Sequence, residues 1–139
     1  MESSDFMAFS FQPLDYANED SVEYTYNKYG QLRKQVYEDG AKVVYRYDNS
    51  GALAQVEDYA TGILTKYMYD LSDRLMMYEE EAGEQNHRVR YYYDSMNNLT
   101  KVREGFGGVN RTTTYTYDKD NRVTGVSQNA IPTIPTPIT

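Results

Sequence analysis

The sequence predicts an all-β fold, an antiparallel array of β-hairpins that forms a meander, and three observations predict it. A Tyr-x-Tyr motif recurs five times along the 139 residues. Each copy is followed by Asp or Asn, and three residues later by Gly, Asp or Asn. Two residues further on stands Leu or Val. Aromatic residues at alternate positions, bounded by turn-forming residues, are typical of strands in hairpins.

The tyrosine pairs define the repeat and its strands. They are Tyr24/Tyr26, Tyr45/Tyr47, Tyr67/Tyr69, Tyr91/Tyr93 and Tyr115/Tyr117, and successive copies lie 21 to 24 residues apart. A fixed motif at a variable spacing indicates constant strands joined by loops of different length.

The residues after each pair predict a type I turn that ends in a left-handed residue. The first corner is Asn27, Asp48, Asp70, Asp94 or Asp118, and the last is Gly30, Gly51, Asp73, Asn97 or Asn121. Asp and Asn side chains accept hydrogen bonds from nearby backbone amides. A positive φ favours Gly first, and Asn or Asp next.

This turn predicts the register of each hairpin. The second tyrosine of each repeat should face Leu32, Leu53, Leu75, Leu99 or Val123. Alternation places both tyrosines on one face, which we expect to pack, and mostly polar residues on a wetter opposite face. Val56, Val102 and Val126 fall out of this alternation. Either a β-bulge intervenes, or the second face is also partly buried.

Glycines between the repeats predict the turns that join the hairpins. Asp39-Gly40 indicates a two-residue turn, Thr61-Gly62 and Ala82-Gly83 are weaker versions, and the glycines at 105, 107 and 108 indicate a looser loop. We therefore expect about ten short strands. Residues 22–127 form the repeat array, 1–21 an apolar N-terminal capping segment, and 128–139 a Pro-rich extended tail.

The segment Tyr45–Val56 resembles the consensus of the YD-repeat, or Rhs-repeat, family, and Asp70–Leu75 and Asp118–Val123 repeat it with variation. That family includes bacterial Rhs and wall-associated toxins, insecticidal toxin-complex shells and teneurins. The resemblance implies a spiralling β-sheet that closes into a hollow shell around a toxin or other C-terminal domain, in a secreted or cell-surface protein. Family shells use many more repeats, so five should form a strip or arc, as in a fragment or a short family member.

The resemblance implies a non-catalytic scaffold, a segment of such a shell. Its expected partners are further repeats or copies of itself, joined through exposed sheet edges, so we expect self-association. The net charge of −7 argues against nucleic acid and anionic membrane surfaces. The chain has no cysteine, no apolar run long enough for a membrane helix and no recognisable signal peptide.

No catalytic residue, cofactor or metal site is expected. Asp118–Asn121 superficially resembles the start of a calcium loop, but Val123 and Asn129 occupy the positions where an EF-hand requires Gly and Glu. The only histidine, His87, is expected in a solvated loop, and Glu79–Glu81 at a solvated strand end or in a loop.

Tyrosines outside the pairs suggest an alternative function, a carbohydrate- or protein-binding module. A tyrosine ring suits sugars and protein surfaces, and some family members are described as carbohydrate-binding. The candidates for such a surface, with a glycan or a cell-surface protein as the ligand, are Tyr29, Tyr37, Tyr59, Tyr78 and Tyr92. In the competing interpretation, the tyrosines stack on one another and leave no ring face free.

Overall fold

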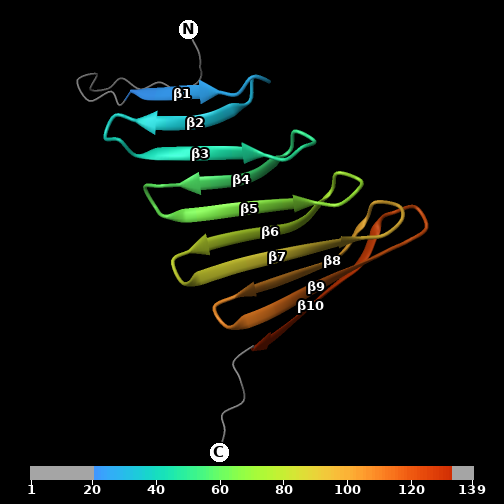
Figure 1. Cartoon of the computed structure of the whole chain (residues 1–139). Helices are drawn as coiled ribbons and strands as arrows, with labels where there is room; N and C mark the ends of the chain where they lie inside the picture. The colour runs from blue at the N-terminus through green and yellow to red at the C-terminus, as the bar shows by residue number, and fades with distance from the viewer. Residues whose placement is uncertain (1–20, 133–139) are drawn as a thin grey trace, which may run out of the picture.

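The computed structural model describes residues 21–132, which form one ten-stranded antiparallel sheet (Figure 1). The strands are β1 (Val22–Tyr26), β2 (Leu32–Tyr37), β3 (Lys42–Tyr47), β4 (Leu53–Asp58), β5 (Ile63–Tyr69), β6 (Leu75–Ala82), β7 (Gln85–Tyr93), β8 (Leu99–Phe106), β9 (Val109–Tyr117) and β10 (Val123–Pro132). Each strand pairs only with its neighbours in the sequence. The predicted all-β hairpin meander is confirmed.

The sheet is an open strip whose first and last described strands lie at opposite ends (Figure 1). β10 continues to Pro132 and pairs with β9 along its length. The array therefore extends beyond the expected boundary at residue 127, into what was expected to be the tail. Residues 1–20 of the expected capping segment, and 133–139 of the expected tail, lie outside the described residues.

A β-bulge follows every repeat turn and explains the displaced valines. Tyr47 pairs with Leu53 as expected, but the next pair is Arg46 with Gln55, so one residue of β4 has no partner. The bulge places Val56 opposite Tyr45, on the same face as the tyrosine pair. The corresponding pairs are Tyr26 with Leu32, Tyr69 with Leu75, Tyr93 with Leu99 and Tyr117 with Val123. Of the two interpretations of the valines, the bulge is correct.

The turns that join the hairpins differ from the expectation in two places. The Asp39-Gly40 turn has three residues instead of two: the Tyr37 amide donates to the Ala41 carbonyl oxygen, and Gly40 has φ +90°. The prediction failed because Gly40 occupies the left-handed position that ends a three-residue turn. The expected loose loop is also wrong. The glycine at 105 lies inside β8, and the two glycines at 107 and 108 alone join Phe106 to its partner Val109.

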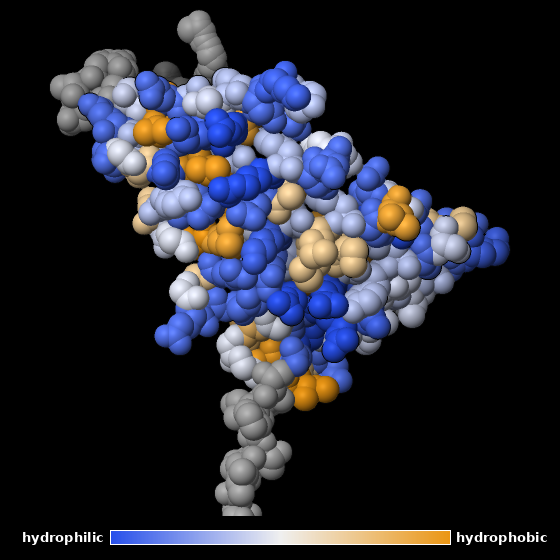
Figure 2. Space-filling view, viewed as in Figure 1, coloured by the Kyte–Doolittle hydropathy of each residue, from blue (hydrophilic) through white to orange (hydrophobic). Residues whose placement is uncertain are grey.

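Neither face of the sheet carries a second layer within residues 21–132. Val89, 7% exposed, is the single buried apolar side chain among them. On the face seen in Figure 2, apolar residues form small separate patches among hydrophilic ones. Within residues 21–132, no element covers the face that the sequence predicts to pack, so that expectation stays a prediction. The contacts that hold the strip together lie within the sheet, such as the edge-to-face pair of Tyr67 and Tyr78, with ring centroids 5.6 Å apart.

Candidate functional site: the repeat junctions

Each repeat turns through the same side-chain-capped bend. In the second repeat, Asp48 Oδ1 accepts hydrogen bonds from the amides of Ser50 at 2.9 Å and Ala52 at 3.0 Å. Gly51 then has φ +92°, and its amide donates to the Asp48 carbonyl oxygen. Asn27, Asp70, Asp94 and Asp118 accept the equivalent pairs of amides. Because Asn27 forms the same bend, the turn requires the side-chain oxygen but not its charge.

These hydrogen bonds lower the pKa of the turn carboxyls. For Asp48, the largest cause is the hydrogen bond from the Ser50 side chain, followed by the Ala52 amide. For the other three, the largest cause is the backbone amide four residues later. A lowered pKa means that the folded turn favours the carboxylate form. Within residues 21–132, no cluster of His, Cys, Asp or Glu has the arrangement of a metal site.

The second tyrosine of a repeat binds the preceding repeat. The Tyr47 hydroxyl donates to the Leu32 carbonyl oxygen at 2.6 Å, and the Tyr69 hydroxyl donates to that of Leu53 at 2.9 Å. The same contact joins Tyr93 to Leu75 at 2.7 Å and Tyr117 to Leu99 at 2.5 Å. All four junctions between repeats in the array therefore carry one tyrosine hydroxyl–carbonyl lock.

The lock compensates for a gap in the backbone ladder. Between β4 and β5, pairing begins at Gln55 and Lys66, so Leu53 lies beyond the last pair at the turn end. An unpaired carbonyl oxygen away from water is costly, and a hydroxyl donor removes that cost. The lock was not foreseen from the sequence, although its donor is the most regular position of the repeat.

A second set of contacts joins the turns of successive repeats. In three repeats, the side chain after the left-handed corner reaches the next turn, whereas Ala52 holds this position in the second repeat and is too short to do so. Gln31 Nε2 donates to the Gly51 carbonyl oxygen at 2.8 Å, and Arg74 Nη1 donates to Asn97 Oδ1 at 2.8 Å. Asn98 Nδ2 likewise contacts Asn121 Oδ1 at 2.9 Å. Four of the five repeats carry a polar side chain at this position, with Ala52 as the exception, and this recurrence is a sequence signal that could have identified the contact.

His87 and Glu79 do not lie where they were expected. His87 is in β7 and not in a solvated loop, with its ring between those of Tyr78 and Phe106, at centroid distances of 6.1 and 5.2 Å. Its Nε2 atom is buried without a hydrogen bond among the described residues. Glu79 is 5% exposed within β6 and is held by Arg88 and the Asn86 amide. The sequence does not indicate strands here because the polar run from residue 79 to residue 88 shows no alternation of apolar and polar residues.

The five candidate ligand tyrosines do not form one surface. Tyr29 and Tyr59 lie in turns at opposite ends of the strands, and Tyr92 lies on the face opposite Tyr37 and Tyr78. Lys28, Lys42 and Lys101 lie over the rings of Tyr29, Tyr59 and Tyr92, respectively, at 5.2, 4.5 and 4.4 Å. An intramolecular cation therefore already contacts one face of these three rings. A ligand role for the five residues remains a prediction.

No family model and no curated protein matches the sequence. Similar solved structures include the crystal structure of TcdB2-TccC3-Cdc42, with 15% identity and a TM-score of 0.45 over 82% of this chain. They also include a Photorhabdus luminescens Tc holotoxin pore with a mutated TccC3, with 14% identity and a TM-score of 0.34 over 78%. This chain spans 8% and 9% of the length of those chains. No helix in the described part of the chain is long and apolar enough to cross a membrane.

Proposed function

We propose that the chain is a non-catalytic scaffold, a segment of a larger β-shell built from the same repeats. The observation that carries this proposal is the direction of the junction contacts. Each tyrosine hydroxyl binds the carbonyl of the repeat before it, as Tyr69 binds Leu53. Every repeat can donate this hydrogen bond to the repeat before it and accept one from the repeat after it. Further repeats can therefore be added to the array through the same contact. The family resemblance places such shells in secreted or cell-surface toxin-like proteins.

The two ends of the array support continuation. Tyr26 is the first tyrosine in the donor position, is 58% exposed and has no hydroxyl partner within residues 21–132. At the other end, Arg122 holds the position from which Arg74 reaches the next turn. Among the described residues, Arg122 binds only its own turn, through Asp118 and Asp120. Each end therefore presents half of a junction.

The sheet edges identify the partners that fit. Among the described strands, β1 and β10 each pair on one side only. An unpaired strand edge presents a row of backbone donors and acceptors to another strand. We infer that the partner is either a further repeat of a longer chain or a second copy of this one. A head-to-tail contact of this kind is heterologous, so it leads to chains of copies unless the rotation closes a ring.

Light scattering coupled to size exclusion, over a concentration series of the full chain, tests this function. We expect a mass that rises with concentration above that of one chain. Val126→Lys places a charge on β10, where Val126 is exposed, and should shift the mass toward the monomer. Met96→Lys, an exposed turn residue, is the matched control and should associate like the parent. A parent that stays monomeric throughout, or equal effects of both variants, contradicts the proposal.

A further inference from the structure

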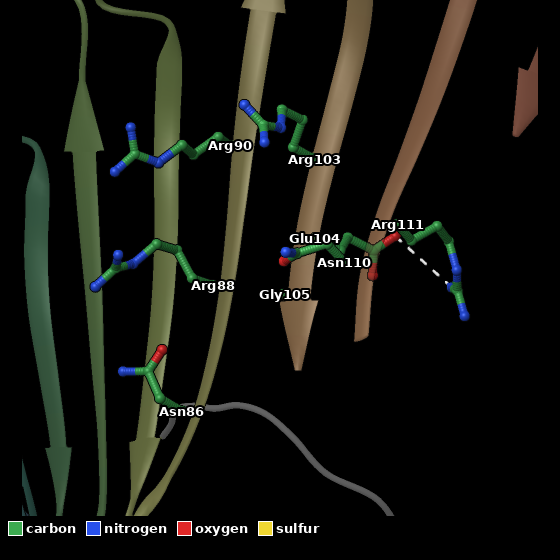
Figure 3. Close-up of a pocket in the computed structure, with 8 residues that line it drawn as sticks. All are labelled: Asn86, Arg88, Arg90, Arg103, Glu104, Gly105, Asn110 and Arg111. Carbon is green, nitrogen blue, oxygen red and sulfur yellow. Dashed lines mark ion pairs between the residues drawn. The ribbon is translucent and has the colours of Figure 1, made fainter. Parts of the chain in front are cut away.

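Four cationic side chains share one face of β7 and β8, the face opposite the tyrosine pairs. They are Arg88, Arg90, Lys101 and Arg103. Paired residues of an antiparallel sheet point to the same side, and Arg90 lies directly opposite Arg103. Figure 3 shows the three arginines extending to one side of the strands, while Glu104 and Arg111 form their ion pair on the other. We call these four residues with their surroundings the arginine face.

The arginine face contains no carboxylate over four strands. β7, β9 and β10 hold no Asp or Glu, and the one acidic residue of β8, Glu104, points to the tyrosine face. The neighbours of the cations on β9 and β10 are uncharged hydrogen-bonding residues: Asn110, Thr112, Thr114, Ser127 and Asn129. A solvated face of a chain with net charge −7 would be expected to mix both signs. This segregation indicates a site for an anion.

Arg90 and Arg103 face each other across β7 and β8, which places two positive charges side by side. Like charges directly opposite each other destabilise a sheet. Neither guanidinium forms an ion pair or hydrogen bond with a described residue, whereas Arg88 is held by Glu79 and Lys101 lies over the Tyr92 ring. We propose that Arg90 and Arg103 bind carboxylate side chains of an acidic polypeptide segment. A guanidinium matches a carboxylate through two parallel hydrogen bonds, and the bound anion neutralises both charges.

A hollow beside the arginines gives the anion a place. It measures about 380 Å³ and is lined by Asn86, Arg88, Arg90, Arg103, Glu104, Gly105, Asn110 and Arg111. The one carboxylate among them, that of Glu104, forms an ion pair with Arg111. A Cβ at position 105 would lie 2.9 Å from Asn110 Oδ1, so a larger residue there would displace the Asn110 side chain. The Asn110 side chain, which lines the hollow, offers an amide that can bind a peptide group.

The surroundings distinguish a polypeptide carboxylate from other anions. On the β6 side, Glu79 and Glu81 lie on the same face, so a long polyanion such as nucleic acid would meet repulsion there. The one aromatic ring on this face of β7 and β8 is Tyr92, and Lys101 already lies over one side of it, so this face offers a sugar few aromatic surfaces for stacking. One or two carboxylates on a flexible polypeptide fit both constraints.

The direct test is a titration of the full chain with a hexaglutamate peptide, monitored by NMR through the side-chain Nε–H signals of arginine. The signals of Arg90 and Arg103 should shift and saturate, and hexaglutamine should leave them unchanged. R90Q/R103Q should weaken the affinity at least about tenfold. The charge-matched control is R33Q/K119Q, at exposed positions elsewhere, which should bind like the parent. Absence of a shift, or equal weakening in both variants, overturns the proposal.

A second variant distinguishes loss of binding at the arginine face from loss of folding. R90K/R103K keeps both charges and should melt like the parent, but it loses the two-pronged geometry, so hexaglutamate affinity should fall several-fold. In the parent, hexaglutamate should raise the melting temperature, because a ligand that binds only the folded state stabilises it. Unchanged affinity in R90K/R103K, or tighter binding of a sulfated oligosaccharide than of hexaglutamate, overturns the assignment to polypeptide carboxylates.

Discussion

The hydroxyl of Tyr69 donates a 2.9 Å hydrogen bond to the carbonyl oxygen of Leu53, across the junction between two repeats. No second layer lies over the sheet within residues 21–132, so such contacts between hairpins replace a core. In an array of this kind, stability depends on each hairpin and on its interface with the next. Deleting one oxygen atom, that of the tyrosine hydroxyl, is enough to remove the tyrosine lock from that interface.

Tyr69→Phe removes the donor and leaves the Leu53 carbonyl oxygen without a partner at the junction. We expect the free energy of unfolding to fall by about 1 kcal/mol. Urea denaturation followed by circular dichroism measures the loss. Tyr26→Phe is the matched control, because the Tyr26 hydroxyl has no partner among the described residues, and it should unfold like the parent. Equal effects at both positions would mean that the hydroxyl does not lock the repeats.

Gly51→Val tests the left-handed corner of the turn. Gly51 has φ +92°, and an added Cβ would meet only Gln31 Nε2 at 3.8 Å, an ordinary contact. The expected loss of about 1–3 kcal/mol therefore comes from backbone strain and not from a clash. Thermal denaturation measures it. Gly51→Asn should lose less, because Asn97 and Asn121 hold the same corner at φ 67° and 63°. A Val variant that melts like the parent contradicts the turn assignment.

The turns and the hairpin register could be predicted because both are local. The carboxylate of Asp48, the left-handed Gly51 and the facing pair of Tyr47 and Leu53 all lie within seven residues of sequence. The backbone of the turn requires a side-chain acceptor at its first corner and a residue that tolerates positive φ at its last corner, and both residue types can be recognised in the sequence. The bulge was foreseen only as one of two alternatives, since Val56 reveals a shift of face but not where the extra residue lies.

The junctions could not be predicted, because they join repeats across many residues. Leu32 and Tyr47 are 15 residues apart in the sequence. The repetition of tyrosine identified the position, but not that its hydroxyl group donates a hydrogen bond to the preceding repeat. The sequence also could not predict that no second layer covers the sheet within residues 21–132, because alternation indicates which face is more apolar but not whether anything covers it. His87 was misplaced because the hairpin of β6 and β7 is longer than those before it.

Acid should weaken the fold through the turn carboxyls. The pKa values of Asp48, Asp70, Asp94 and Asp118 are lowered in the folded state. Groups with a lowered folded pKa contribute stability above their unfolded pKa of about 4, and this contribution is lost as pH falls through the folded pKa. We expect the melting temperature of the parent to drop in this range. Replacing all four residues by Asn should make the drop smaller while preserving the turns, as Asn27 does naturally.

The control for this experiment is Glu38→Gln, an exposed carboxyl without a hydrogen bond to a described residue. This substitution should leave the fall of the melting temperature at acid pH, the acid limb of the stability curve, unchanged. A fourfold Asn variant that loses stability as steeply as the parent would show that other carboxyls, such as Glu79, govern the acid limb.

Alkaline pH should act on the tyrosine face, most clearly at Tyr78. Burial, with the hydrogen bond to Glu80 second, raises the pKa of Tyr78 to about 12. A raised folded pKa contributes stability that is fully present below the unfolded pKa of about 10 and is lost as pH rises through the folded value. The parent should therefore lose stability between these values. The phenolate absorbance of the parent minus that of Tyr78→Phe isolates the titration of this one ring.

Glu80→Gln distinguishes the two causes at Tyr78. The substitution removes the carboxylate that accepts the Tyr78 hydroxyl at 2.9 Å and leaves the ring in the same surroundings. Because a neighbouring negative charge opposes ionisation of the phenol, its removal should lower the pKa of Tyr78 part of the way toward that of a free tyrosine. A phenolate titration at an unchanged pH would mean that burial beside the neighbouring strands alone holds the proton. A return to the free value would mean that the carboxylate is the dominant cause.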